Sequence, residues 1–323
     1  MTSPAFIKAV YSTLNSSELL ANVIPQYDMP RPRSCEFWQR GLNDTYKLSS
    51  GTEDFMLRVY RNNWRTPSAI KFELEALMYL HQNGASVAIP VARKDGGFIT
   101  PILAPEGERY VIVTQYAKGK ILKFEDVKDS IIFGQAAADI HRCSSGFESS
   151  HMRHRLNLKH LIDEPLGSIQ LYLAHRPSDW EFLTKLAIRL SKLVNEAGAD
   201  SLDYGFCHGD FHGENAHEHN GQVTHFDFDC CGMGWQVYDL ATFKWVIRLL
   251  EKEDMLWESF LAGYRSVREI PDLDLDLIEV FVGIRDIWFF GLNTKNSLAQ
   301  GWLNDRYIDL HMGFLKGVAE RIA

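Results

Sequence analysis

The sequence predicts an α+β fold of two lobes, in which a β-rich N-terminal lobe precedes a mainly helical C-terminal lobe. Short strand-like runs separated by turn signals fill residues 35–61. Apolar residues recur at helical spacing from about residue 125 onward. A short polar connection with one glycine, residues 115–120, separates the two patterns and is typical of a hinge. We therefore assign residues 1–115 to the first lobe and 116–323 to the second, with a ligand-binding cleft between them.

The N-terminal residues 3–21 are expected to form a helix. Ser3 can cap it and Pro4 suits its first turn. Apolar residues share one face of this helix, namely Phe6, Val10 and Leu14. Three prolines make the following residues 25–34 an irregular linker.

The first lobe is then expected to hold a strand meander and one helix. Strands are predicted at residues 35–40, 45–48, 55–60, 98–102 and 109–115. The Gly-Leu-Asn-Asp sequence at 41–44 predicts a hairpin turn between the first two strands. The helix is predicted over residues 66–83, because Thr66 can cap it, Pro67 suits its first turn and leucines recur along one face.

The second lobe is expected to consist mainly of helices. Their predicted ranges are 125–142, 157–164, 178–197, 236–251, 254–268, 274–293 and 303–321. Ser178 and Glu181 have the spacing of a capping box at the start of one of them.

Composition excludes several classes of protein. The chain has 323 residues, a hydrophobic fraction of 46% and a net charge of −8, so an acidic globular protein is expected and a nucleic-acid binder is not. Its five cysteines are an odd number and do not suggest a secreted disulfide framework. No signal peptide and no membrane-spanning run is evident, and the expected location is the cytoplasm.

The most informative stretch is His-Gly-Asp-Phe-His-Gly-Glu-Asn at residues 208–215. Its two glycines predict a loop, with the strand-like residues 204–207 before it and 222–226 after it. Such a loop would place Asp210, Asn215 and Asp227 close together at one end of the flanking strands.

These three residue types suit phosphoryl transfer. Asp210 can orient and deprotonate an attacking hydroxyl group. Asn215 and Asp227 offer the hard oxygen ligands that Mg²⁺ prefers when it also binds phosphate oxygens. The spacing therefore predicts a magnesium-dependent transfer of phosphate from ATP to a hydroxyl group.

A zinc site is an alternative for this region, because it is dense in histidine and cysteine: Cys207, His208, His212, His217, His219, His225, Cys230 and Cys231. No Cys-x-x-Cys pair is present, and a glycine separates His208 from His212. We expect His208 to brace the loop through a backbone hydrogen bond, and His217 and His219 to face solvent in a hairpin.

Other candidates have a structural as well as a functional interpretation. Arg58, on the third strand, is either a cation for ATP phosphates or a solvent-facing side chain. Glu73 or Glu75 on the following helix could pair with it, or both could be solvated. Asp239 is either a helix N-terminal acid or a brace beneath the catalytic loop, and we favour the brace.

The quoted motifs, followed by Asp227-Phe-Asp and Asp239-Leu-Ala, resemble the aminoglycoside phosphotransferase/choline kinase-like superfamily, which has the two-lobed protein-kinase fold. The resemblance implies that Asp210 is the catalytic base and that Asn215 and Asp227 ligate magnesium. It implies ATP binding by Arg58, with Glu73 as its partner on the following helix, and by the turn that contains Gly41, Asn43 and Thr45. Gln115 is a further expected nucleotide-binding residue, and His208, His212 and Asp239 are expected to give structural support. Arg58 falls where the family commonly has a lysine, and the nucleotide loop has a single glycine; both are departures from the pattern.

The expected function is ATP- and Mg²⁺-dependent phosphorylation of a small molecule such as an amino alcohol, a homoserine-like compound or an aminoglycoside. The sequence Arg58-Val-Tyr-Arg61 followed by Trp64 also resembles the bacterial stress-response branch, whose members phosphorylate Ser and Thr of proteins. A catalytically inactive nucleotide-binding scaffold is the third possibility. The oligomeric state is not predicted.

The substrate side has two candidate features in the second lobe. A group of acidic residues could bind an amine, or could instead interact with the dipole at the N-terminus of a helix: Glu269, Asp272, Asp274, Asp276, Glu279 and Asp286. Aromatic residues could cage a quaternary ammonium group or could be core: Trp288, Phe289, Phe290, Trp302 and Tyr307.

Overall fold

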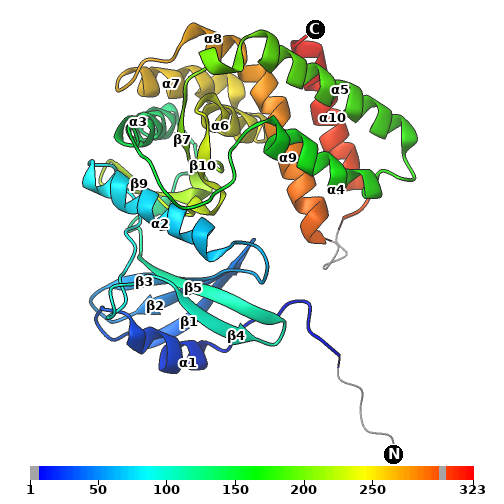
Figure 1. The fold of residues 1–323 in the computed structure, drawn as a ribbon. Helices are drawn as coiled ribbons and strands as arrows, with labels where there is room; N and C mark the ends of the chain where they lie inside the picture. Colours follow the sequence, from blue (N-terminus) through cyan, green and yellow to red (C-terminus); the bar gives the residue numbers. More distant parts are fainter. Residues whose placement is uncertain (1–6, 298–302) are drawn as a thin grey trace, which may run out of the picture. The chain divides into compact units, whose positions relative to one another are not determined.

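The computed structural model describes residues 7–297 and 303–323, and its contacts divide the chain into two compact units (Figure 1). The first unit contains the residues up to 82, together with 87–118 and 149–152. The second contains 83–86, 119–148 and the residues from 153 onward. A sheet dominates the first unit and helices dominate the second, so the predicted α+β class is confirmed.

The first unit is built on a five-stranded antiparallel sheet with the order β1-β2-β3-β5-β4. Its strands are β1 (Ser34–Arg40), β2 (Asp44–Ser49), β3 (Asp54–Val59), β4 (Thr100–Ala104) and β5 (Gly107–Gln115). The register pairs Thr45 of β2 with Arg58 of β3. This places the β1–β2 turn at the end of the sheet where Arg58 lies.

Each face of this sheet is covered by helical segments. One face packs its apolar side chains, Leu57 and Val59 among them, against η1 (Leu19–Val23) and η2 (Ile24–Gln26), which follow the short α1 (Ser16–Glu18). The other face packs Tyr60 and Ile112 against α2 (Pro67–Gln82). The alternation follows from the two-residue period of a strand. Thr66 caps α2 as predicted, because its hydroxyl accepts the N–H of Ala69 at 3.2 Å.

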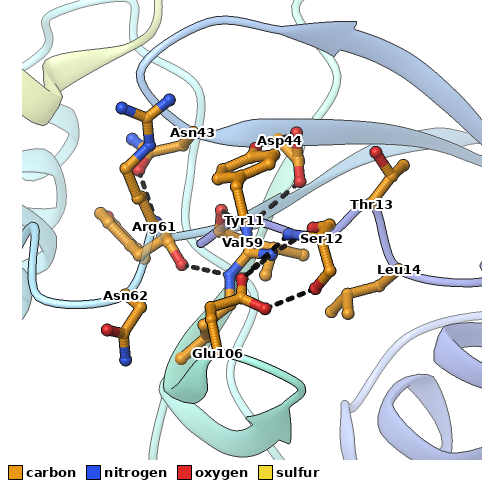
Figure 2. A network of polar contacts seen from close by, with 12 residues as sticks. Tyr11, Ser12, Thr13, Leu14, Asn43, Asp44, Val59, Arg61, Asn62 and Glu106 are labelled. Carbon is orange, nitrogen blue, oxygen red and sulfur yellow. Dashed lines mark hydrogen bonds and ion pairs between the residues drawn. The ribbon is translucent and has the colours of Figure 1, made fainter. Parts of the chain in front are cut away.

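The predicted helix over residues 3–21 is wrong for residues 7–15, because the helical segments begin only at Ser16; residues 16–21 are helical as predicted. Ser3, Pro4 and Phe6 lie outside the described residues. Figure 2 shows Tyr11 and Ser12 bound instead to the sheet, through Asp44 and Glu106.

Buried Arg109 lies at the centre of this network. Its guanidinium contacts Asp44 at 3.2 Å and donates to the carbonyl of Ser12 at 2.9 Å. The phenol of Tyr46 bonds both the N–H and the C=O of Leu14, at 3.0 and 2.9 Å. Side chains of the sheet therefore form the hydrogen bonds that these backbone groups would otherwise form within a helix. This explains why the segment is not helical despite the helical spacing of its apolar residues.

The second unit is mainly helical. Its α-helices are α3 (Val127–Cys143), α4 (Glu164–Tyr172), α5 (Pro177–Glu196), α6 (Val237–Leu249), α7 (Glu253–Arg265), α8 (Asp272–Asp276), α9 (Ile278–Ser297) and α10 (Asp305–Arg321). Its other helical segments are η3 (Lys159–Asp163), η4 (Ala199–Ser201), η5 (Gly213–Asn215) and η6 (Phe228–Cys230). Its strands are β6 (Lys120–Ile121), β7 (Tyr204–Cys207), β8 (Ala216–His219), β9 (Gln222–His225) and β10 (Gly232–Trp235).

Three details differ from the prediction. The helix expected at 157–164 continues to Tyr172, and the one expected at 274–293 is two helices, α8 and α9. The proposed capping box at Ser178 is wrong, because α5 already begins at Pro177 and its N-cap residue makes no side-chain hydrogen bond. Proline at the first helical position supplies the start signal without a capping side chain.

Helix α9 lies at the centre of the second unit and packs against α4, α5, α6 and α10. Helices α3 and α7 also pack together, and two glycines let their backbones meet. A Cβ atom on Gly134 would lie 2.2 Å from the carbonyl oxygen of Phe260. Within the described ranges, none of the helices combines the length and apolarity needed to cross a membrane.

Asp274 of α8 makes the stability of this unit sensitive to pH. Burial, and secondarily the nearby carboxylate of Asp203, raise its pKa from 3.8 to about 6. The folded state then binds a proton that the unfolded state has lost, so stability falls as pH rises from about 4 to about 6. We expect Asp274→Asn to remove this loss and to be roughly 1–3 kcal/mol more stable than wild type at pH 7.

The measurement is the difference in Tm between variant and wild type at pH 4.5 and at pH 7. The matched control is Asp272→Asn, because Asp272 is an exposed acid on the same helix. A difference that is the same at both pH values would contradict the expectation.

Candidate active site

A loop of the second unit carries the predicted motif at residues 208–215. Strand β7 leads into it, and strands β8 and β9 form the hairpin that follows. Gly209 has φ of +80°, and a Cβ atom there would lie 2.2 Å from the carbonyl oxygen of Cys230. Only glycine fits this position without a shift of the backbone. The loop is therefore packed tightly against the segment that begins at Asp227.

Asp210 and Asn215 are in direct contact within this loop. The amide nitrogen of Asn215 donates to the carboxylate Oδ2 of Asp210 at 3.2 Å and to its backbone carbonyl at 3.0 Å. The ring Nε2 of His212 also lies 3.4 Å from Oδ2 of Asp210. Asn215 is buried, whereas the side chain of Asp210 is 24% exposed. The carboxylate of Asp210 thus reaches the surface of a fixed loop.

Asp227 follows strand β9 in a left-handed backbone conformation, with φ of +60°. Such a conformation is uncommon for a residue with a side chain and concentrates at functional sites. The N–H of the neighbouring Phe226 donates to the carbonyl of Asn215 at 2.9 Å, which ties this segment to the loop. The structure therefore brings the Asp227 segment next to Asn215.

These residues fit a magnesium ion by the chemistry of their donors. The amide nitrogen of Asn215 is occupied, so its carbonyl oxygen is turned to the opposite side. An amide oxygen and the carboxylate of Asp227 are the hard ligands that Mg²⁺ combines with water and phosphate. Zinc is not supported: in residues 7–297 and 303–323, no group of three or more His, Cys, Asp or Glu side chains could hold a metal ion.

Asp239, in the first turn of α6, binds backbone N–H groups of the loop at residues 208–215. Its carboxylate accepts the N–H of His208 at 2.7 Å and that of Gly209 at 2.8 Å. Nε2 of His141 lies 3.2 Å from the same group. Asp239 is fully buried, so these contacts, rather than the helix dipole alone, explain an acid at this position.

His208 forms the backbone hydrogen bond expected for it. Its Nε2 lies 3.0 Å from the carbonyl oxygen of Phe226, and its Nδ1 accepts the N–H of Asp210 at 3.3 Å. Burial lowers the pKa of His208 despite nearby carboxylates, which favours the neutral ring that this pair of bonds requires. His208 therefore joins the loop to the end of the β8–β9 hairpin.

Arg285 of α9 completes the surroundings of Asp210. Its Nη2 lies 2.5 Å from Oδ1 of Asp210, and its Nη1 donates to the carbonyl oxygen of Gly209 at 3.2 Å. Burial acts to raise the pKa of Asp210, but the charges of His212 and Arg285 outweigh it and hold this pKa well below its ordinary value. Asp210 is therefore an ionised, fixed hydrogen-bond acceptor.

In the first unit, Arg58 pairs with Glu73 and not with Glu75. Nη1 of Arg58 lies 2.5 Å from Oε1 of Glu73, and the hydroxyl of Tyr60 donates to Oε2 at 2.9 Å. Glu73 is completely buried. Glu75 instead accepts from the hydroxyl of Ser149 at 2.6 Å. The structure thus supports the ion-paired interpretation of Arg58 over a freely solvated side chain.

The turn between β1 and β2 lies near this ion pair, because the register of the sheet places Arg58 close to the start of β2. Asn43 is buried, and its side-chain oxygen accepts the N–H of Arg61 at 3.1 Å. The N–H of Gly41 donates to the carbonyl of Asn43 at 3.0 Å, which closes a tight turn. Thr45 lies opposite Arg58, and Gln115 is an exposed residue at the end of β5.

Three of the six candidate acidic residues of the second lobe are engaged within the fold. Asp274 accepts the N–H of Asp203, Glu279 pairs with Arg248 and Lys244, and Asp286 accepts from the indole of Trp245. An acidic amine-binding pocket at these residues is therefore not supported.

The aromatic residues of α9 are engaged as well. Trp288 and Phe290 are buried, and Phe290 stacks on His311. The guanidinium of Arg285 lies 4.8 Å from the centroid of Trp288 and 5.6 Å from that of Phe289. These rings already surround a cation of the protein. Trp302 lies outside the described residues.

Two arginines near the site do not belong to the predicted set. Arg153 donates from Nε to the carbonyl oxygen of Cys231 at 2.8 Å and also contacts the carbonyl of Asp229. Arg285 binds Asp210, as described above. The signal for Arg285 was the charged pair Arg285-Asp286 inside the otherwise apolar residues 280–292, since buried charges need partners.

Comparison with known proteins identifies a matching family and a related sequence. The sequence profile of the phosphotransferase enzyme family matches residues 35–270. An uncharacterized protein of Synechocystis is 32% identical over 316 residues, which cover 97% of this chain and 86% of the relative.

Two solved structures share the fold. An amicoumacin kinase in complex with AMP-PNP and Ca²⁺ aligns with a TM-score of 0.75 and 20% identity, covering 94% of this chain and 93% of that one. A microcompartment-associated aminopropanol kinase aligns with a TM-score of 0.73 and 23% identity, covering 94% and 95%. The predicted kinase-like fold is therefore confirmed.

Proposed function

This chain belongs to the phosphotransferase enzyme family and is a kinase, and we propose that it transfers the γ-phosphate of ATP to the hydroxyl group of a small amino alcohol. The observation that carries the proposal is the fixed, ionised carboxylate of Asp210 in its loop. The amino group of the proposed acceptor is inferred from the aminopropanol and amicoumacin kinases that share the fold. The proposal keeps residues 1–115 as the nucleotide-binding lobe and 116–323 as the catalytic and acceptor-binding lobe.

Asp210 is the proposed base. Arg285 binds its Oδ1, whereas Asn215 and His212 lie 3.2 and 3.4 Å from its Oδ2, so Oδ1 is the oxygen that can still accept another hydrogen bond. The acceptor hydroxyl would donate to Asp210, which aims the hydroxyl oxygen at the γ-phosphorus. The O–P bond to ADP breaks as the new O–P bond forms, and Asp210 takes the hydroxyl proton. Because the transition state is loose, orientation matters more than the basicity of the carboxylate.

Asn215 and Asp227 are the proposed ligands of the divalent cation. When bound, Mg²⁺ would neutralise negative charge on the transferred phosphate. The use of a nucleotide with a divalent ion is supported by the AMP-PNP and Ca²⁺ complex of the amicoumacin kinase. We propose that Arg58, fixed by Glu73, binds phosphate oxygens, that the Gly41–Thr45 turn contacts the nucleotide, and that Gln115 lines its site.

The test is an acceptor screen with purified protein. Thermal shift with Mg-ATP, alone and with amino alcohols, homoserine and aminoglycosides, identifies ligands that bind the native state. ADP release and mass spectrometry of the acceptor then show transfer. A phosphorylated amino alcohol is the expected product. Phosphate found only on Ser or Thr of proteins would favour a protein kinase, and no response to Mg-ATP would favour an inactive scaffold.

Arg58 gives a separate prediction for nucleotide binding. Replacing it with methionine removes a charge that we assign to the ATP phosphates and leaves Glu73 buried without its cation. We expect KM for ATP to rise by roughly tenfold or more, which corresponds to about 1.4 kcal/mol. Steady-state kinetics with varied ATP measure it.

Lys47→Met is the control, because Lys47 is also a cation of this sheet and pairs with Asp54 at 2.9 Å. An unchanged KM for ATP in Arg58→Met would remove Arg58 from the proposed nucleotide site.

A further inference from the structure

Arg285 is buried at a cost that stability alone does not explain. Only 1% of its side chain is exposed, and its Nε has no hydrogen-bond partner in the part of the chain that the structure describes. An unpaired buried donor is unfavourable, and a buried ion pair is frequently no more stable than an apolar replacement of the same size. A role in the reaction would explain its presence.

The guanidinium makes two contacts that meet at the catalytic loop. Nη2 binds the side chain of Asp210 at 2.5 Å, and Nη1 binds the main-chain oxygen of Gly209 at 3.2 Å. One rigid, planar group therefore fixes the carboxylate relative to the peptide that carries it.

Aromatic rings hold the guanidinium itself in place. Its central carbon lies 5.1 Å from the centroid of Trp245 on α6, and 4.8 and 5.6 Å from those of Trp288 and Phe289 on α9. Trp245 is anchored in turn, because its indole donates to Asp286 at 2.8 Å. The rings attract a cation and leave it little freedom to rotate.

We propose that Arg285 is a positioning residue for the transfer reaction, which holds Asp210 at the angle from which it receives the acceptor hydroxyl. Under this assignment the aromatic rings serve the protein's own cation and do not cage an ammonium group of the acceptor. The inference rests on the proposed function, because it needs Asp210 to act on that hydroxyl.

The experiment is chemical rescue of Arg285→Ala with guanidinium chloride at tens of millimolar, using an acceptor that wild type phosphorylates. Misplacement of a reacting group by about 1 Å can cost on the order of 10²-fold in rate. We expect kcat to fall by roughly that factor with KM for ATP nearly unchanged. Guanidinium should restore kcat at least about tenfold by refilling the site.

Two comparisons separate positioning from simple cavity filling. Tetramethylammonium fits among the rings but has no N–H group, so it should not restore kcat. Arg248→Ala is the control, because Arg248 is a partly buried arginine in an ion-pair network of this unit, with Glu253 and Glu279, away from the loop. It should keep wild-type kcat and show no rescue.

Arg285→Lys covers the case in which the alanine variant does not fold. Lysine keeps the charge, but its single ammonium group cannot bind the carboxylate of Asp210 and the carbonyl of Gly209 with the planar geometry of a guanidinium. We expect wild-type-like Tm and kcat reduced by roughly tenfold or more. Wild-type kcat in a folded Arg285 variant, or equal rescue by tetramethylammonium, would overturn the proposal while the proposed function stands. A wild type that transfers phosphate to no acceptor would overturn both.

Discussion

Asp210→Ala is expected to lower kcat by at least about 10³-fold, since removing a positioned base typically costs 10²–10⁴-fold and this residue also orients the acceptor. Affinity for ATP should change little, because Asp210 acts on the acceptor hydroxyl. Single-turnover measurement of phosphorylated product gives the rate, and calorimetric titration with nucleotide gives the affinity.

The same variant carries a stability effect that must be separated from the loss of rate. Without Asp210 the buried guanidinium of Arg285 loses its charge partner, which is unfavourable. The double variant Asp210→Ala with Arg285→Met removes both charges, so we expect it to regain stability without regaining activity. Recovery of Tm alone would show that the lost rate does not come from unfolding.

The control for Asp210 is Asp179→Ala. Asp179 pairs with Arg176 at 2.6 Å, and 16% of its side chain is exposed, so its surroundings match those of Asp210 in kind. It lies on α5 and contacts no residue of the loop. Equal loss of kcat in both variants, or turnover of Asp210→Ala within tenfold of wild type, would show that Asp210 is not the base.

The contacts between Asp210, Asn215 and the Asp227 segment could be predicted because they are local. Asp210 and Asn215 lie in the loop between strands β7 and β8, and Asp227 lies just after strand β9; tight loops between short strands have few conformations. The resemblance to a known family added their expected roles. The residue pattern left the partner of Arg58 open between two glutamates, and the resemblance favoured Glu73; in the structure the orientation of α2 selects Glu73.

Contacts made across the chain could not be predicted. Arg285 is separated from Asp210 by 75 residues in sequence, and its position follows from the packing of α9 at the centre of the second unit. The segment around Tyr11 has helical periodicity, yet its polar groups bind Asp44 and Tyr46 of a strand formed later in the chain. Local propensity is a weak prior where a sheet offers better partners.

Asp239 should show the largest loss of stability among the residues near the site. Removing its side chain leaves the buried N–H groups of His208 and Gly209 without an acceptor, and His141 loses a partner. Each unsatisfied buried donor costs about 1–3 kcal/mol. We therefore expect Asp239→Ala to destabilise the second unit by about 3–5 kcal/mol.

Asp305→Ala is the control that separates the contribution of these hydrogen bonds to stability from the contribution of the helix dipole. Asp305 is also an acid in the first turn of a helix, α10, but 68% of its side chain is exposed. The dipole contributes only about 0.3–1 kcal/mol at an exposed terminus, so this control should cost no more than that. Urea unfolding followed by fluorescence of the tryptophans on α6 and α9 measures both variants.

Asp239→Asn then tests what the loop itself requires. The amide keeps one oxygen for a loop N–H but places an NH₂ group where the carboxylate of Asp239 accepted the other. We expect this variant to remain folded at low temperature and to lose kcat by roughly tenfold or more, because the peptide that precedes Asp210 is no longer held at both N–H groups. Full activity in a folded Asp239→Asn variant would show that the hydrogen bonds of Asp239 stabilise the fold but do not orient Asp210.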